Sequence, residues 1–293
     1  MNKLAPIVAA AAVAMSASAA SALSVTGFDP ATDPTGVVTN ALLASGSGIN
    51  IVSGSESYVG AAGQGGTFSG LSLTSASGNP TLGMSSGILL TSGTAAALPQ
   101  TNTASNFTVE TGSGSDADLS ALVGGGNVND VNFLSFSFTV DSGNAVTADF
   151  IFGSDEFPDQ SVTDVFGIFV DGVNYAFFED GSLVSFVTGE NASQFVANND
   201  YAIEYDGLSR RLTFTGLLDA DLTEHTIKIA IGDTSDNAFD SGVFVSGLQA
   251  ITTASETGGV TPGVGAAVPI PASLPLLGAA VAGFAAFRRR RGA

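Results

Sequence analysis

The sequence contains no cysteine and no tryptophan, and its 293 residues include a single histidine, His225. Without cysteine, disulfides, thiolate metal sites and cysteine nucleophiles are all excluded. Because tryptophan is absent and only four tyrosines occur, the aromatic platforms that usually line a sugar-cleaving cleft are scarce. Cysteine-dependent enzymes are therefore excluded, and glycosidases are disfavoured.

Basic residues are also rare, since eight lysines and arginines stand against 27 acidic residues. Lys3 lies near the N-terminus and four arginines lie at the C-terminus, which leaves Arg210, Arg211 and Lys228 for the whole chain between them. Such an acidic surface repels nucleic-acid phosphates and anionic lipid, and it suits divalent cations or high salt. We therefore expect no nucleic-acid partner.

Residues 1–22 have the features of a secretory signal peptide. Lys3 precedes an apolar run of roughly a dozen residues, and Ala20-Ser21-Ala22 matches the A-x-A site of signal peptidase. An N-terminal membrane anchor is the alternative, but the run is short and ends in serine and alanine. Signal peptidase is thus a predicted partner, and the rest of the chain is predicted to be exported.

Residues 23–251 contain short runs in which apolar and polar residues alternate, with Gly, Asn and Asp between the runs. In NFLSFSFTV, the apolar residues Leu134, Phe136 and Phe138 fall on one face of a strand. This period of two is typical of a half-buried antiparallel sheet. At least eight runs of this kind predict an all-β fold, an antiparallel sandwich or jelly-roll-like domain with few short helices.

Two short helices are expected within this domain. Asp33 is a candidate N-cap with Pro34 at the first helical position. The run DADLSALVGGG predicts one further turn. After Ile251, residues 252–267 are rich in Gly, Thr and Ala and are interpreted as a flexible linker. The apolar face of the first helix is predicted to hold Val37, Val38, Ala41 and Leu42.

Acidic clusters lie at predicted strand ends or in the loops beside them. Carboxylates close together repel one another unless they are protonated or neutralised by a hard cation, and oxygen-only clusters suit Ca²⁺. The competing interpretation is that aspartate simply favours solvated turns. DTSDNAFD lacks the glycine and the closing glutamate of an EF-hand, so that motif is rejected. The candidate Ca²⁺ ligands are Asp118, Asp155, Glu156, Asp164, Asp233, Asp236 and Asp240.

Catalytic interpretations have less support. GMSSG, residues 83–87, matches the G-x-S-x-G pattern of hydrolases, but the following ILLTSG predicts a strand where the serine elbow needs a helix. His225 opens an alternating run, which favours a residue at a strand end over a general base. Asp155 or Glu156 as the acid of a glycosidase is the other candidate. We expect no enzymatic activity and no catalytic residues.

The order of several motifs is similar to that of the choice-of-anchor L domain family over roughly residues 40–250. The most specific are FGSDEF followed by DVFGIFV, and the closing DNAFDSGVF. The resemblance implies an exported β-rich surface domain for adhesion or binding, with no established enzyme activity. Phe157 stands where the family often has tyrosine, and Thr163-Asp164 replaces a frequent Asn-Asp. The acidic motif residues of the family match Asp118, Asp155, Glu156, Asp164, Asp233 and Asp240.

Residues 268–293 combine a proline-containing motif, an apolar run and an arginine cluster. As a helix, the 14 residues from Leu274 to Phe287 would extend about 21 Å, less than the roughly 30 Å hydrocarbon core of a bilayer. The arginines should stay on the cytoplasmic side, which leaves residues 23–267 outside. The segment resembles the VPxxA variant of PEP-CTERM sorting signals, which implies processing by an exosortase-type enzyme. An uncut transmembrane anchor is the alternative. The signal comprises Val268, Pro269, Pro271, Ala272, Arg288, Arg289, Arg290 and Arg291.

Together these features predict an exported protein that passes through an inner-membrane intermediate to the cell surface or the extracellular space. The expected role is adhesion or binding in a biofilm matrix, with exopolysaccharide or other surface proteins as partners and Ca²⁺ as a stabilising cofactor. A lectin-like carbohydrate-binding module, held permanently by its C-terminal helix, is the alternative.

Overall fold

The computed structural model describes residues 23–95, 98, 101–160 and 164–254. The predicted signal peptide, most of the predicted linker and the sorting tail lie outside these ranges. Two α-helices, one 3-10 helix and the strands are placed within them. The elements in chain order are β1 (Ser24–Gly27), α1 (Gly36–Leu42), β2 (Ile49–Ile51), β3 (Ser57–Val59), β4 (Gly65–Leu73), β5 (Leu82–Thr91), α2 (Ala117–Leu122), β6 (Val128–Val140), β7 (Ala145–Ser154), β8 (Asp164–Val170), β9 (Val173–Asn174), η2 (Ala192–Gln194), β10 (Phe195–Ala197), β11 (Gly207–Ser209), β12 (Leu212–Leu217), β13 (His225–Thr234) and β14 (Ser241–Ile251).

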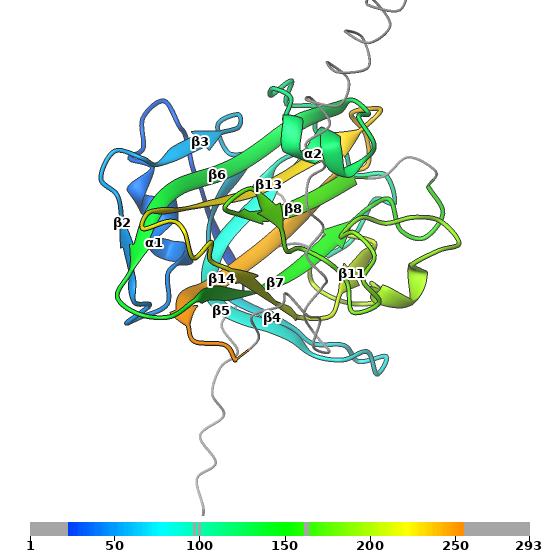
Figure 1. Cartoon of the computed structure of the whole chain (residues 1–293). Helices are drawn as coiled ribbons and strands as arrows, with labels where there is room; N and C mark the ends of the chain where they lie inside the picture. Colours follow the sequence, from blue (N-terminus) through cyan, green and yellow to red (C-terminus); the bar gives the residue numbers. More distant parts are fainter. Residues whose placement is uncertain (1–22, 96–97, 99–100, 161–163, 255–293) are drawn as a thin grey trace, which may run out of the picture.

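The described strands form two antiparallel sheets packed as a sandwich (Figure 1). The first sheet has eight strands in the order β1-β4-β5-β14-β7-β11-β10, with β12 also paired to β7. The second has six strands in the order β2-β6-β13-β8-β9, with β3 also paired to β6. The predicted all-β sandwich with few short helices is confirmed.

The core between the two sheets is built from residues that the alternation places on one face. On β6, Leu134, Phe136 and Phe138 are buried, whereas the polar residues between them are only partly buried. Phe150 of β7 is 1% exposed, and its ring centroid lies 5.4 Å from that of Phe166 on β8. This aromatic pair joins the inner faces of the two sheets, where side chains interdigitate to form the core of a sandwich.

Each sheet is also covered on part of its outer face, which the half-buried pattern did not predict. On the first sheet, Ile151 and Phe244 belong to an outer cluster with Tyr205 from the segment before β11. On the second sheet, α2 lies over β8 and β13 (Figure 1), and its Leu119 packs with Phe169. Every residue of β8 is therefore buried, because apolar side chains on both of its faces are covered.

The first helix exists but begins later than predicted. The N-cap is Thr35, which makes no side-chain capping hydrogen bond, so the expectation of Asp33 as N-cap is wrong. The Asp33 carboxylate instead accepts a hydrogen bond from the backbone N–H of Asp29 at 2.9 Å, in the turn that precedes the helix. Of the predicted apolar face, Val38 and Leu42 are buried and Ala41 is partly buried, but Val37 is 51% exposed, so its place on that face is wrong.

The second predicted helical turn is confirmed as α2. Asp116 is its N-cap and accepts hydrogen bonds from the backbone N–H groups of Asp118 and Leu119. Such a cap satisfies N–H groups that have no partner inside the helix. The Asp116 carboxylate also pairs with Lys228 of β13, which ties the start of the helix to the sheet beneath it.

Candidate functional site

Two of the connections between the sheets, β7 to β8 and β13 to β14, start and finish at the same end of the sandwich. β7 of the first sheet ends at Ser154, and β8 of the second begins at Asp164. β13 of the second sheet ends at Thr234, and β14 of the first begins at Ser241. Since β7 pairs with β14 and β8 pairs with β13, all four strand ends lie together. We call this region the crossover end.

Two pairs of aspartates face each other at the crossover end, one pair in each sheet. Asp164 stands opposite Asp233 in the β8–β13 register, a position where Cβ atoms are about 4.5–5.5 Å apart. In the first sheet, the backbone N–H of Asp155 donates to the carbonyl of Asp240 at 3.2 Å. Glu156 follows directly and interacts with the charges of Asp233 and its loop neighbour Asp236. The structure thus brings together the crossover cluster, which comprises Asp155, Glu156, Asp164, Asp233, Asp236 and Asp240.

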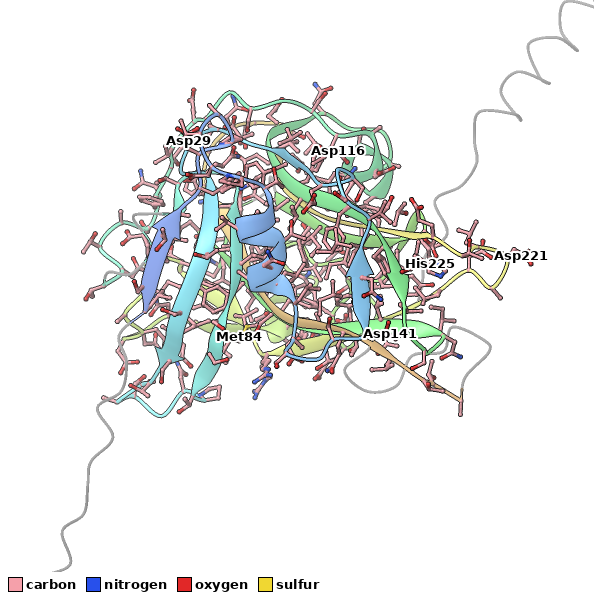
Figure 2. All side chains as sticks on the ribbon, turned by 90° about the vertical axis from the view of Figure 1, so that its left-hand side faces the viewer. Asp29, Met84, Asp116, Asp141, Asp221 and His225 are labelled. Atoms are coloured by element: carbon pink, nitrogen blue, oxygen red, sulfur yellow. The ribbon has the colours of Figure 1, made fainter. Side chains whose placement is uncertain are left out.

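Asp118, the remaining candidate ligand, contacts a different group. Its carboxylate lies 2.7 Å from the Nζ of Lys228, which also contacts Asp116. Lys228 and Asp233 are five residues apart on the extended strand β13, roughly 17 Å at about 3.4 Å per residue. Figure 2 shows Asp116 at the α2 edge of the sandwich. The structure therefore places Asp118 in an ion pair beside α2 and does not bring it into the crossover cluster.

The carboxylates of the crossover cluster are buried, and several of their oxygens lack a hydrogen-bond partner. Glu156 is 1% exposed, and neither of its side-chain oxygens has a partner. Asp233 is fully buried, and although Ser92 and Asp164 lie near it, neither of its oxygens makes a well-formed hydrogen bond. Asp155 accepts one bond, from the Asp206 N–H at 2.9 Å, and its other oxygen has no partner. Burying charged oxygens without compensation is costly, so this arrangement requires neutralisation.

Burial raises the pKa of these carboxyl groups, and the neighbouring carboxylates raise it further. The pKa of Asp155 and that of Glu156 each rise to about 9, chiefly because burial disfavours the charged form. The same cause raises the pKa of Asp240 to about 8 and that of Asp233 to about 7. The pKa of Asp164 also lies well above its ordinary value, through burial and the charge of Asp233. At neutral pH, protons or a cation must therefore balance the negative charge here.

In the part of the chain that the structure describes, basic side chains do not neutralise the negative charge of the crossover cluster. Arg211 pairs with Asp149, and Lys228 pairs with Asp116. The third basic residue of this part, Arg210, is exposed. The histidine, His225, opens β13 at the strand end opposite Asp233.

The donor chemistry fits a hard cation, because every side-chain donor of the crossover cluster is a carboxylate oxygen. The described residues nevertheless contain no group of three or more His, Cys, Asp or Glu side chains already arranged to hold a metal ion. The side chains are thus gathered at one end of the sandwich without forming a finished coordination sphere.

A family model places the chain among known domains. The model of the choice-of-anchor L domain matches residues 28–249. The chain belongs to the choice-of-anchor L domain family. The match starts between β1 and α1 and ends within β14, so this choice-of-anchor L domain includes the second sheet, the first sheet apart from β1 and the end of β14, and the whole crossover cluster. Family membership implies an exported protein attached to a surface.

Comparison with curated proteins and with solved structures gives no match. In the described part of this choice-of-anchor L protein, no helix is long and apolar enough to cross a membrane.

Two buried acids of the choice-of-anchor L domain were missed by the sequence analysis. Asp130 is 2% exposed; one of its oxygens accepts from the Gly112 N–H at 2.6 Å, and the other has no partner. Its charge raises the pKa of Asp233 and of Asp240. Glu204, 1% exposed, also has one oxygen without a partner and interacts with Asp155. Local alternation gave no signal for Glu204, because a strand with Ile203 and Tyr205 facing the core would place Glu204 on the opposite, solvent-facing side.

Ser85 and His225, which were considered for catalysis, lie on strands of different sheets in the choice-of-anchor L domain. Ser85 is exposed in the middle of β5, on a strand and not on a strand-to-helix elbow. His225 is 5% exposed, and its Nδ1 lies 2.8 Å from the carboxylate of Asp171. The prediction that His225 stands at a strand end is confirmed.

Proposed function

We propose that this protein is an exported, non-catalytic binding module that acts in adhesion at the cell surface or in the extracellular matrix. The observation that carries the proposal is the match of the sandwich, residues 28–249, to a domain family whose members are attached to surfaces. The exposed strand position of Ser85 and the burial of His225 against Asp171 support a role without catalysis.

Attachment is proposed to depend on the two chain ends, which lie outside the described residues. Signal peptidase removes residues 1–22, and residues 268–293 hold the exported chain at the inner membrane until an exosortase-type enzyme cuts near the VPIPA motif. The support is in the sequence, which combines a short apolar run with a terminal arginine cluster. The released protein then reaches the cell surface or the extracellular matrix.

Intact mass of the protein recovered from the cell envelope and from the medium tests this processing. The expected mature chain begins after Ala22 and ends near Ile270, without the four arginines. Changing Pro269 and Pro271 of the motif to alanine is expected to preserve the full tail, because the enzyme would lose its recognition sequence. A matched control is Pro262→Ala in the predicted linker, which should be processed normally. Recovery of a wild-type chain that still ends at Ala293 would contradict processing and indicate a permanent anchor.

The adhesive role predicts that cells lacking the protein attach less to one another and to surfaces. Expression of the wild-type chain and of a Ser85→Ala variant should restore attachment equally, because no chemistry at Ser85 is involved. The measurement is the number of cells retained on a surface, counted for cells that lack the protein, cells that express the wild-type chain and cells that express Ser85→Ala. Attachment that survives loss of the protein would contradict the adhesive role. Inhibition of attachment by soluble exopolysaccharide would identify the partner as a carbohydrate.

A further inference from the structure

We propose that the crossover cluster binds one Ca²⁺ ion, which ties the two sheets together at the crossover end. The principal ligands are the carboxylates of Glu156, Asp164 and Asp233, with Asp236 beside them. This inference goes beyond the proposed surface role and does not depend on it.

The ligands come from both layers of the sandwich. Asp164 and Asp233 are fixed opposite each other on β8 and β13 of the second sheet. Glu156 follows the end of β7, so it is held by the first sheet, and its backbone N–H donates to the side chain of Ser154 at 3.0 Å. Ser92, beyond the end of β5, already links the layers because its hydroxyl donates to Asp164 at 3.3 Å. A cation shared by these carboxylates would therefore join the two sheets directly.

The observation that points to a cation is the state of the buried oxygens. Both Glu156 oxygens are buried and have no hydrogen-bond partner, and one Asp164 oxygen is in the same position. Protonation of Glu156 removes only its own charge and leaves the neighbouring charges of Asp236 and Asp233 in place. Asp233 provides neighbouring negative charge and no donor. A divalent cation satisfies the oxygens and the charge together.

The chemistry of the site favours Ca²⁺ over other divalent cations. Nitrogen and sulfur donors are absent from the cluster, since the chain has no cysteine and His225 lies at the opposite end of β13. Ca²⁺ accepts about six to eight oxygen ligands in flexible geometry, whereas Mg²⁺ requires a near-ideal octahedron and loses water reluctantly. Because no three carboxylates stand in ligand geometry, binding requires side-chain rotation, which the long side chain of Glu156 allows.

The first test compares the melting temperature of the full-length protein in EDTA with that in 10 mM CaCl₂ or MgCl₂. With Ca²⁺ at about 100 times its Kd, the melting temperature should rise by roughly 5–10 °C. The rise with Mg²⁺ should be smaller. No rise with 10 mM Ca²⁺ would overturn the proposal, and it would leave the attachment and processing results unaffected.

Neutral isosteres locate the site. Glu156→Gln and Asp233→Asn are each expected to abolish the rise caused by Ca²⁺, while the melting temperature in EDTA stays the same or increases because repulsion is relieved. The matched control is Asp221→Asn, since Asp221 projects into solvent at the edge of the molecule (Figure 2). This control should keep the full rise. A rise retained in both cluster variants, or lost in the control, would overturn the assignment.

Terbium luminescence gives a second readout that does not depend on unfolding. The chain has no tryptophan, and Tyr205 interacts with the charges of Asp155, Asp164 and Asp240, so it can sensitise Tb³⁺ bound in the cluster. Saturable emission on tyrosine excitation, displaced by Ca²⁺ and reduced in Asp233→Asn, is expected. Emission that does not saturate, or that is unchanged in Asp233→Asn, would contradict the site.

Discussion

Lowering the pH from 9 to 5 in the presence of EDTA is expected to increase the free energy of unfolding by at least about 3 kcal/mol. The pKa values of Asp155 and Glu156 rise to about 9 in the folded protein, and that of Asp240 rises to about 8. In the unfolded chain, carboxyl groups titrate near their ordinary values of roughly 4. Between these values the folded state binds more protons than the unfolded state. This contribution is therefore fully present below about pH 4 and is lost as the pH rises toward 9.

The size of the effect follows from the number and coupling of the buried acids. One unit of pKa shift corresponds to about 1.4 kcal/mol, but the groups repel one another, so the individual shifts do not add. Asp130, Glu204 and Asp206 lie near the cluster, and their negative charges also raise the pKa values of its carboxyl groups. Asp130 acts on Asp233, and Glu204 and Asp206 act on Asp155. Partly exposed ion pairs such as Arg211 with Asp149 have small effects on stability.

Urea unfolding followed by far-ultraviolet circular dichroism at pH 5, 7 and 9 measures this dependence. Glu156→Gln should flatten it, because the variant has one fewer buried group to titrate. Saturating Ca²⁺ should also flatten or reverse it, since cation binding requires ionised carboxylates. A chelated protein that becomes less stable from pH 9 to pH 5 would show that the buried carboxyl groups stay ionised in the folded state.

Phe150→Ala is expected to lower the free energy of unfolding by about 3–5 kcal/mol. Phe150 is 1% exposed on β7, opposite Val245 of β14 on one side and Leu212 of β12 on the other. Its ring also packs against Phe166 of the facing sheet. The strands on both sides are hydrogen-bonded to β7, so they cannot collapse easily into the space left by the ring, and most of the cavity should persist.

Urea unfolding measures the stability of Phe150→Ala. The slope of the free energy of unfolding against urea concentration should stay unchanged. Phe150→Leu should lose less, because leucine fills part of the same volume. Val37→Ala is the control, since Val37 is 51% exposed and its truncation should change stability by less than about 0.5 kcal/mol. A loss below about 1 kcal/mol for Phe150→Ala would contradict its position in the core between the sheets.

The buried side of several strands could be predicted because alternation is a local property of the chain. Leu134, Phe136 and Phe138 are on the inner face of β6, as the period of two indicates. The same reasoning could not predict that β8 is covered on both faces, since α2 lies far from it in the sequence. The start of α1 was predicted wrongly from a local rule, because the Asp33 carboxylate accepts from the Asp29 N–H in the preceding turn and does not cap the helix.

Some features of the crossover cluster also follow from local sequence, and others follow only from tertiary contacts. By itself, the sequence determined that an all-β domain carries too many carboxylates for its few basic residues and that these carboxylates lie near strand ends. Only the tertiary structure decided which acids meet: strand pairing sets Asp164 opposite Asp233, and Lys228 holds Asp118 elsewhere. It also decided that Asp130 is buried beside them. The physical reason is that register and sheet packing, which join residues distant in the chain, determine whether a carboxylate faces water or another carboxylate.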